Sequence, residues 1–456
     1  MVINEMPCRL LNAIRDEVTH FLSELIRINT TNPPGNEMAA AKYLADHLSP
    51  EDFECEIFES APKRGNVITR LRGTGEKPNL LLLSHLDVVA ANASEWSVDP
   101  FKGVVKDGYV WGRGAVDMKG MTAIEVMVMK LLKRNNVKLK GDVILAATAD
   151  EEQGGLLGAN YLLQNNHEKI YAPYVLNEGG GLAMPTKKGN VFTVQTAEKG
   201  ILWFKVKAKG TPGHGSLPNM ADNAIMRMNN VIDKLGNYES PIFIVPTLKR
   251  FFEEISKQDS TLLEPFTQLL TNPELSDQIL DELSKISELA EEIRPRLRMT
   301  ITPTIIHGGV KQNIIPSECE TVFDCRILPG QKLEHTIRLI KTLLGEIDSK
   351  KLSFHGLQKQ EPSESTSETP LYATISNVLR EFEPQCGVTP ILTTGGTDSR
   401  FFRRKGSICY GFHPRYPEIF SGKIVKLEHG IDERISIKNL IFGTSVLYET
   451  VKKFMT

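Results

Sequence analysis

The sequence predicts an α/β protein in which helices cover a largely parallel sheet, with an α+β unit inserted between two parts of that fold. Strand and helix patterns alternate along the first part of the chain, and the strands beginning at Leu80 and Asp142 are apolar on both faces. Strands buried on both sides are typical of parallel sheets between helical layers. After about residue 198 the pattern changes, because residues 201–209 alternate apolar and polar side chains as a half-exposed strand does.

The elements of the first part follow from hydrophobic spacing and turn residues. Residues 8–28 carry apolar side chains at helical spacing and are expected to form an amphipathic helix. Pro33-Pro34-Gly35 ends this helix in a loop, and Asn36 can cap a second helix over residues 37–48. Besides the two apolar strands, the elements expected before residue 198 are strands at residues 55–58, 67–70 and 103–110 and a helix at residues 120–133.

The inserted unit is expected to span residues 198–329, so that residues 1–197 and 330–456 form the main domain. Besides the half-exposed strand, its expected elements are a helix at residues 223–235, a charged helical stretch at 248–298 and strands at 299–306 and 320–327. The polar residues 357–369 are expected to form a loop. The elements expected after that loop are a helix at residues 374–382, strands at 389–393 and 407–410, and a final helix at 437–454.

Composition excludes several classes of protein. A chain of 456 residues exceeds one ordinary core, which favours two domains. Because 54 Lys and Arg nearly balance 56 Asp and Glu, we expect neither a nucleic-acid nor an anionic-membrane partner. The six cysteines are scattered without a C-x-x-C pair, which favours neither a thiolate metal site nor a disulfide scaffold. No signal-peptide pattern or long apolar run is found, so we expect a cytoplasmic protein without a membrane span.

Four segments place His, Asp or Glu where a predicted strand or turn ends. His85 and Asp87 lie two residues apart at the end of the Leu80 strand and therefore share a face. Asp117 lies on a glycine-bounded turn before a helix, residues 150–152 are three adjacent acids, and Glu178 precedes three glycines. Open α/β sheets build sites at the carboxyl ends of their strands, and clustered carboxylates require a cation. Taken singly, these groups could also be a packed histidine, a helix cap and a solvated acidic turn.

In order along the chain, SHLDVV, GRGAVDMKG, ADEEQGG, NEGGG and LEHGIDER resemble the motifs of the M20 family of metallopeptidases and aminoacylases. The resemblance covers nearly the whole chain and implies a zinc-exopeptidase-like domain with two zinc ions, replaceable by cobalt or manganese, and an inserted lid or dimerisation domain. The implied ligands are His85, Asp117 and Glu178 for the first ion and Asp117, Glu152 and His429 for the second. Imidazole and carboxylate ligands without thiolate also suit a hydrolytic zinc site.

The resemblance further implies roles for residues next to the ligands. Asp87 would orient His85, and Glu151 would be the general base. A cis peptide bond is expected between Asp117 and Met118. From position alone, His413 competes with His429 for the second ion, and the family pattern favours His429.

The inserted domain and a late glycine turn are expected to contact the substrate. His214, in the segment GTPGHGS, resembles the family's histidine that reaches the substrate carbonyl. Asn313, Arg326, Gly396 and Thr397 match positions that contact substrate in relatives, and an arginine can grip a carboxylate through two hydrogen bonds. Relatives are usually dimers, so we expect a homodimer in which His214 serves the neighbouring subunit, although a long insertion could supply it within one chain.

The expected reaction is cleavage of an amide bond next to a free carboxylate. The substrate would be a small peptide, as for a carboxypeptidase or dipeptidase, or alternatively an N-acyl amino acid. Two other classes fit less well. A non-catalytic carboxylate-binding protein would not need the complete set of ligands with Glu151, and a nucleotide-binding protein would need G-x-G-x-x-G spacing, which GRGAVDMKG lacks.

Overall fold

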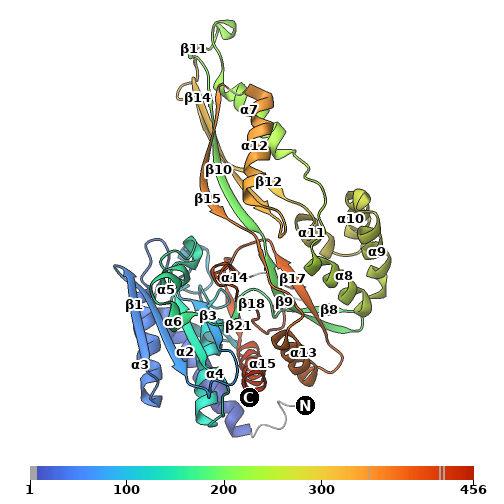
Figure 1. Cartoon of the computed structure of the whole chain (residues 1–456). Coiled ribbons are helices and arrows are strands. Elements are labelled where there is room, and N and C mark those ends of the chain that lie inside the picture. Colours follow the sequence, from blue (N-terminus) through green and yellow to red (C-terminus); the bar gives the residue numbers. More distant parts are fainter. Residues whose placement is uncertain (1–7, 349, 421–422, 425–426) are drawn as a thin grey trace.

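The computed structural model describes residues 8–348, 350–420, 423–424 and 427–456 and contains two large sheets (Figure 1). The ten-stranded main sheet has the order β1-β2-β6-β3-β7-β18-β9-β16, with β17 and β8 also paired to β9. Its strands are β1 (Cys55–Ala61), β2 (Arg64–Leu71), β3 (Leu80–His85), β6 (Val143–Thr148), β7 (Tyr174–Asn177), β8 (Ala183–Thr186), β9 (Gly189–Glu198), β16 (Ser363–Glu364), β17 (Gly387–Thr393) and β18 (Ile408–Gly411). The α/β class is confirmed, and the sheet is mixed.

The parallel centre of the main sheet is the part that the apolar runs predicted. Strand β3 pairs in parallel with β6 and β7, and β18 pairs in parallel with β7. The antiparallel pairs lie towards the edges, such as β1 with β2 and β8 with β9. Every residue of β3 and β6 is buried, because helices cover both faces. The carboxyl ends of the four parallel strands β6, β3, β7 and β18 therefore meet at one edge.

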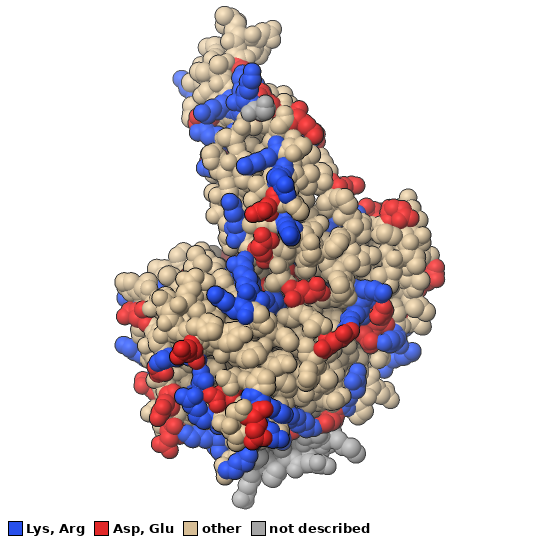
Figure 2. Space-filling view, viewed as in Figure 1, with Lys and Arg blue, Asp and Glu red and all other residues tan. Residues whose placement is uncertain are grey.

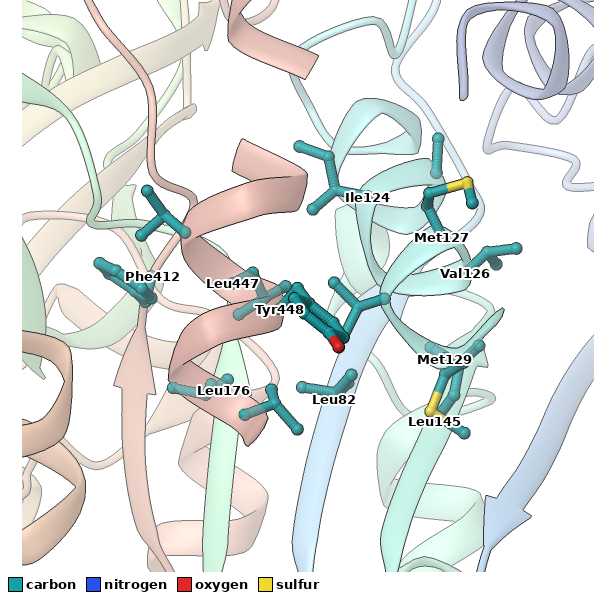
Figure 3. Packing of buried hydrophobic residues seen from close by; sticks show 14 of the residues in the cluster. Leu82, Ile124, Val126, Met127, Met129, Leu145, Leu176, Phe412, Leu447 and Tyr448 are labelled. Atoms are coloured by element: carbon teal, nitrogen blue, oxygen red, sulfur yellow. The ribbon is translucent and has the colours of Figure 1, made fainter. Parts of the chain in front are cut away.

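The largest hydrophobic core lies between this sheet and a layer of helices. Its helices are α2 (Cys8–Arg27), α3 (Glu37–Leu48), α4 (Lys119–Arg134), α13 (Pro370–Phe382) and α15 (Ile437–Met455). Figure 3 shows Leu82 and Leu145 of the sheet facing Ile124 and Met129 of α4 and Leu447 of α15. On the other face, α5 (Ala159–Asn165) and α14 (Ser399–Arg403) cover a smaller core.

The second sheet is antiparallel, with the order β12-β14-β10-β15. Its strands are β10 (Gly200–Lys209), β12 (Thr300–Gly308), β14 (Glu318–Ile327) and β15 (Leu352–Gln360). Helices α7 (Ala224–Gly236) and α12 (Leu333–Asp348) pack on one face. Lys199 alone separates β9 from β10, so one continuous run of chain links the two sheets.

The expected boundaries need an adjustment that we propose from this topology. Helix α12 and strand β15 follow residue 329 but belong to the second sheet, so we place the second domain boundary near Gln360. The expected loop at residues 357–369 is wrong at its start, because β15 continues to Gln360 and β16 occupies Ser363–Glu364. Strands β15 and β16 are polar because they lie at sheet edges. Hydropathy does not distinguish such polar edge strands from loops.

The charged stretch after residue 245 is helical, as expected, and packs on the main sheet. Its helices are α8 (Pro246–Gln258), α9 (Leu263–Thr271), α10 (Ser276–Ser284) and α11 (Leu289–Ile293). They share a core with Val191, Ala197 and Leu392 of β9 and β17. Among the described residues, no helix combines the length and apolar character needed to cross a membrane. On the face shown in Figure 2, Lys and Arg are interspersed with Asp and Glu.

Candidate metal centre

Five of the predicted ligands converge where the main sheet's parallel strands end. His85 is the last residue of β3, Glu152 lies in the turn after β6, and Glu178 follows β7. Asp117 precedes helix α4, and His429 lies in the loop before β21 (Arg434–Ser436). The predicted clustering of acids at carboxyl strand ends is therefore observed, with a histidine at each side.

Asp117 lies between the two histidines. His85 Nε2 is 3.1 Å from Asp117 Oδ1, and His429 Nε2 is 3.2 Å from Asp117 Oδ2. Glu178 Oε2 is 3.8 Å from His85 Nε2, while Glu152 Oε2 is 3.2 Å from His429 Nε2. One carboxylate thus divides its two oxygens between two donor groups, which is the geometry required of a ligand that bridges two cations.

The electrostatics of this cluster favour positive charge. Hydrogen bonds with Asp117 and Glu152 raise the pKa of His429 to about 10. Burial opposes protonation of His85, but its carboxylate neighbours, Asp117 first among them, raise its pKa well above the ordinary value. Both shifts arise from the surrounding carboxylates, so the cluster attracts positive charge. Divalent cations in the same place would satisfy the same acids, and the donor set of imidazole and carboxylate fits such ions.

Asp87 is buried and connects His85 to the acidic turn. His85 Nδ1 lies 3.0 Å from the backbone carbonyl oxygen of Asp87 and 3.4 Å from its Oδ1. The backbone N–H groups of Glu151 and Glu152 donate to the same carboxylate at 3.1 Å. Asn32 Nδ2 donates to it at 2.8 Å. Burial raises the pKa of Asp87, but the hydrogen bonds from His85 and Asn32 outweigh it and the net shift is downwards. One ionised side chain thus orients the histidine and positions the turn that carries Glu151 and Glu152.

Glu151 lies on the side of the cluster nearer to Glu178. Ligand atoms of His85, Glu151 and Glu178 lie within 4.8 Å of one another, as do those of His85, Asp117 and Glu152. Burial, and then the charge of Glu178, raise the pKa of Glu151 well above its ordinary value. Arg400 Nη1 lies 3.7 Å from Glu151 Oε1 and is its nearest cationic partner. Glu151 is therefore placed to exchange a proton beside the ligands.

The two competing histidines have different surroundings. His429 is exposed, has φ +58°, and meets Asp117 and Glu152 as described above. His413 is buried, its Nδ1 accepts a hydrogen bond from Arg415 at 3.1 Å, and burial lowers its pKa well below the ordinary value. This geometry favours His429 as the second histidine ligand. The peptide bond between Asp117 and Met118 is cis, as expected.

Sequence reasoning missed Glu433 and Arg113. The Glu433 carboxylate accepts hydrogen bonds from the backbone N–H groups of Gly114, Val116 and Asp117 at 2.8–3.0 Å. Arg113 donates to Glu433 at 2.7 Å and to the backbone carbonyl of His429 at 3.2 Å. This buried pair joins the two loops that carry Asp117 and His429. Its only signal in the sequence is that both residues stand inside the motifs GRGAVDMKG and LEHGIDER.

The structure does not bring every expected substrate residue to the cluster. His214 lies in β11 (Gly213–His214), which Figure 1 shows at the end of the second sheet farthest from the main sheet. Asn313 lies beside it, because its carbonyl accepts from the N–H of Gly215 at 2.8 Å. Neither residue reaches the candidate ligands of its own chain in this conformation.

The other expected substrate residues lie near the cluster but already have partners. Arg326 pairs with Asp324 through two hydrogen bonds of 2.7 and 3.0 Å, and its Nη1 donates to the Thr394 carbonyl at 3.3 Å. The N–H and hydroxyl of Thr397 both donate to the buried carboxylate of Glu198, at 2.7 and 3.0 Å. Gly396 lies against the side chain of Gln360.

Comparisons with known proteins agree with this fold. A model of peptidase family M20/M25/M40 matches residues 81–453. The chain is 27% identical to an uncharacterized metallohydrolase of Methanocaldococcus jannaschii, over 96% of this chain and 99% of that protein. It is also 27% identical to the human N-fatty-acyl-amino acid synthase/hydrolase PM20D1, over 84% of this chain and 74% of that protein. The crystal structure of an M20 family metallo-carboxypeptidase from Sulfolobus solfataricus is similar in fold, with a TM-score of 0.73, 19% identity and coverage of 96% and 99%.

Proposed function

The chain belongs to peptidase family M20/M25/M40, and from that premise we propose that it is a dinuclear hydrolase that cleaves an amide bond next to a free carboxylate. That it is a metal-dependent hydrolase follows from the family. The count of two ions is supported by one observation above all, which is that Asp117 presents one oxygen to His85 and the other to His429.

The residues that would hold the ions are those that the sequence predicted. His85, Asp117 and Glu178 would hold the first zinc ion, and Asp117, Glu152 and His429 the second. Cobalt or manganese could replace zinc, since the donor set contains no thiolate. When bound, such ions polarise a carbonyl oxygen and lower the pKa of water towards about 7.

Glu151 would act as the general base. Its carboxylate would accept a proton from the attacking water and donate it to the leaving amine, which restores the carboxylate. Asp87 would fix this residue indirectly, because it holds the backbone N–H of Glu151 while it orients His85. Asp87 would thereby keep Glu151 and His85 in a fixed position relative to each other.

We propose a peptide as the substrate, as for a carboxypeptidase or dipeptidase, and an N-acyl amino acid as the second candidate. The second is favoured by the likeness to PM20D1, whose name describes an N-fatty-acyl-amino acid synthase and hydrolase. Both substrates place a carboxylate beside the amide. Arg326, Asn313, Gly396 and Thr397 remain the proposed substrate contacts, although Thr397 could contribute only through groups that Glu198 does not already occupy.

The test is a screen of dipeptides and N-acyl amino acids before chelation, after chelation, and after zinc, cobalt or manganese is restored. We expect chelation to abolish hydrolysis and metal to restore it, because the site's acids need divalent cations to act on water. The class of compound hydrolysed decides between the two substrates. Full activity of thoroughly metal-free protein would refute the proposal.

We further propose a homodimer in which His214 serves the partner's site. This is supported by the position of His214 far from the ligands of its own chain (Figure 1). Strand β12 lies at an edge of the second sheet and exposes Ile305 and Ile306, so its free backbone groups can pair with a second copy. We also propose that the protein is located in the cytoplasm. This location is favoured by the free cysteines of the described chain, because secreted proteins usually pair theirs.

A further inference from the structure

One tryptophan of this chain is exposed where the other two are not. Trp203 on β10 is 39% exposed, whereas Trp96 and Trp111 are 9% and 8% exposed. The buried pair is held by cations, because Arg113 lies over the ring of Trp96 and Arg434 over that of Trp111. Within the described part of the chain, the backbone of Trp203 pairs in the sheet, but its indole has neither a stacked ring nor a side-chain hydrogen bond. Single exposed apolar side chains are common on protein surfaces, so the position of Trp203 in the fold decides what it can do.

Trp203 belongs to the face of the second sheet that no helix covers. Helices α7 and α12 pack on the face formed by Leu202, Phe204 and their neighbours, so the alternating residues of β10 point the other way. We call this second surface the open face, and its members include Trp203 and Lys205 of β10, Asp324 and Arg326 of β14, and Gln358 of β15. Trp203 is directly opposite Asp324 on one side and Gln358 on the other.

The open face contacts two loops of the main domain near Trp203, which are the acidic turn and the late glycine turn. On the β15 side, the amide nitrogen of Gln358 lies 3.7 Å from the position that a Cβ on Gly154 would occupy, two residues beyond Glu152. On the β14 side, Arg326 donates to the carbonyl of Thr394 at 3.3 Å. Trp203 therefore lies on the part of the open face that borders both the acidic turn and the late glycine turn.

A second contact on the β15 side gives the same placement. Gln360, two residues beyond Gln358, lies so close to Gly396 that an added Cβ there would be 2.4 Å from its Nε2. Farther from the main sheet, the open face becomes polar, because Lys205 pairs with Glu320 and Lys207 with Glu318 at 3.1 and 2.7 Å. The exposed aromatic surface is thus confined to the end of the open face that borders the candidate ligands.

We propose that Trp203 is a specificity-determining residue, whose indole packs against a large apolar side chain or acyl group of the substrate beside the scissile amide. The inference rests on the proposed function and names the preferred substrates within it, namely those with an aromatic or large aliphatic group. An indole offers a wide, rigid apolar surface, and one end of it can stay in water. A hydrophobic wall of this kind discriminates by roughly 10–200-fold for each missing apolar group.

The first experiment compares two substrates that differ only in that group, such as a glycine and a phenylalanine member of whichever class is hydrolysed. We expect Trp203→Ala to lower kcat/KM at least about 10-fold for the phenylalanine compound and less than about 3-fold for the glycine compound. Trp203→Phe should restore most of the loss. Ile286→Ala, which removes an exposed apolar side chain between α10 and α11, is the matched control and should leave both values unchanged.

The second experiment measures binding without turnover. Glu151→Gln protein, loaded with zinc, is titrated with the phenylalanine compound while tryptophan emission is recorded. Because Trp96 and Trp111 are buried, we expect a change in emission that disappears when Trp203→Phe is added to the same protein. This measurement stands even if no compound is hydrolysed, so it separates failure of this inference from failure of the proposed function.

Three results would overturn the assignment. The first is an equal loss of kcat/KM for both substrates in Trp203→Ala, which indicates a general structural role. The second is an emission change that persists without Trp203, or no change at all. The third is a shift of Trp203→Ala from dimer to monomer by light scattering together with equal losses, which would make the residue an interface between copies.

Discussion

Asp117 can face two histidines because hydrogen bonds to the Glu433 carboxylate fix the backbone of its turn. The buried carboxylate of Glu433 accepts three N–H groups of the turn that ends at Asp117, and Arg113 completes its coordination while holding the carbonyl of His429. Each of these donors would lie buried without an acceptor if Glu433 were removed, at about 1–3 kcal/mol apiece. The position of Asp117 between the two histidines therefore depends on Glu433, a residue outside the proposed ligand set.

The candidate ligands and Glu151 could be located from sequence because their residue types and order match a specific set of motifs, and the structure brings them together. Their supports could not, since Glu433 and Asn32 act through contacts with residues far along the chain. The substrate residues show a further limit. Arg326 and Thr397 are expected to contact the substrate, but in this structure they bond to Asp324 and Glu198. Asp324 lies two residues from Arg326 on the same face of β14, so that pairing could have been predicted from the alternation of a strand.

At the residue scale, Glu151→Gln separates proton transfer from metal binding. The amide keeps the shape of the side chain but cannot accept a proton from water, so we expect turnover to fall at least about 100-fold. Metal content by elemental analysis should remain that of the wild type, because the proposed ligands are intact. Glu152→Gln is the matched control and should lose metal. Loss of metal from Glu151→Gln would instead make Glu151 a ligand and leave the base unassigned.

The two histidines give the second prediction at this scale. His429→Ala should bind about one metal ion fewer per chain, because it removes one of three proposed ligands of the second ion. His413→Ala should keep full metal content, since His413 is buried and bonded to Arg415. Thermal unfolding of both variants shows whether either has merely lost its fold. The reverse pattern of metal contents would exchange the two assignments.

At the scale of elements, the apolar core strands and long helices could be predicted from sequence, whereas the polar edge strands β15 and β16 could not. Strands β3 and β6 are buried on both faces, so their composition alone identifies them. Strand β15 lies at a sheet edge with its middle exposed, and its sequence resembles a loop. Helices α8–α11 pack on the main sheet through long-range contacts, and no local pattern in residues 246–293 indicates which sheet they cover.

Helix α4 carries a buried acid that makes stability depend on pH. Burial against the main sheet raises the pKa of Glu125 from 4.5 to about 8, and the Ser84 hydroxyl offsets this only in part. The folded protein therefore keeps a proton that the unfolded chain releases above about pH 4.5. Raising the pH from 5 to 8 thus favours the unfolded state, by as much as about 1.4 kcal/mol per pH unit.

Glu125→Gln removes this titration and should flatten that dependence. We expect the free energy of unfolding of the variant, relative to the wild type, to increase steadily between pH 5 and 8. The absolute difference also contains the packing of a buried amide, so the slope is the informative quantity. Urea unfolding at three pH values measures it, and other titrating groups cancel in the comparison. Parallel curves for the two proteins would show that Glu125 is ionised in the folded state.

At the scale of the whole molecule, the candidate catalytic residue His214 lies far from the candidate metal ligands of its own chain. His214 is on β11 at the far end of the second sheet, while the candidate ligands lie at the edge of the main sheet (Figure 1). The proposed dimer resolves this separation, because a two-fold axis can bring the far end of one chain to the site of the other.

Mixing two inactive proteins tests whether sites are shared. Glu151→Gln chains retain His214, and His214→Ala chains retain Glu151. If His214 acts in the partner's site, a mixed dimer contains one site with both groups and one with neither, and its activity should reach about half that of a wild-type dimer. Random exchange of equal amounts makes about half of the dimers mixed, so the whole sample should recover about a quarter. Exchange is verified by native mass spectrometry of differently tagged chains. If His214 acts within its own chain, no site in the mixture holds both groups, and activity stays at the level of the separate proteins.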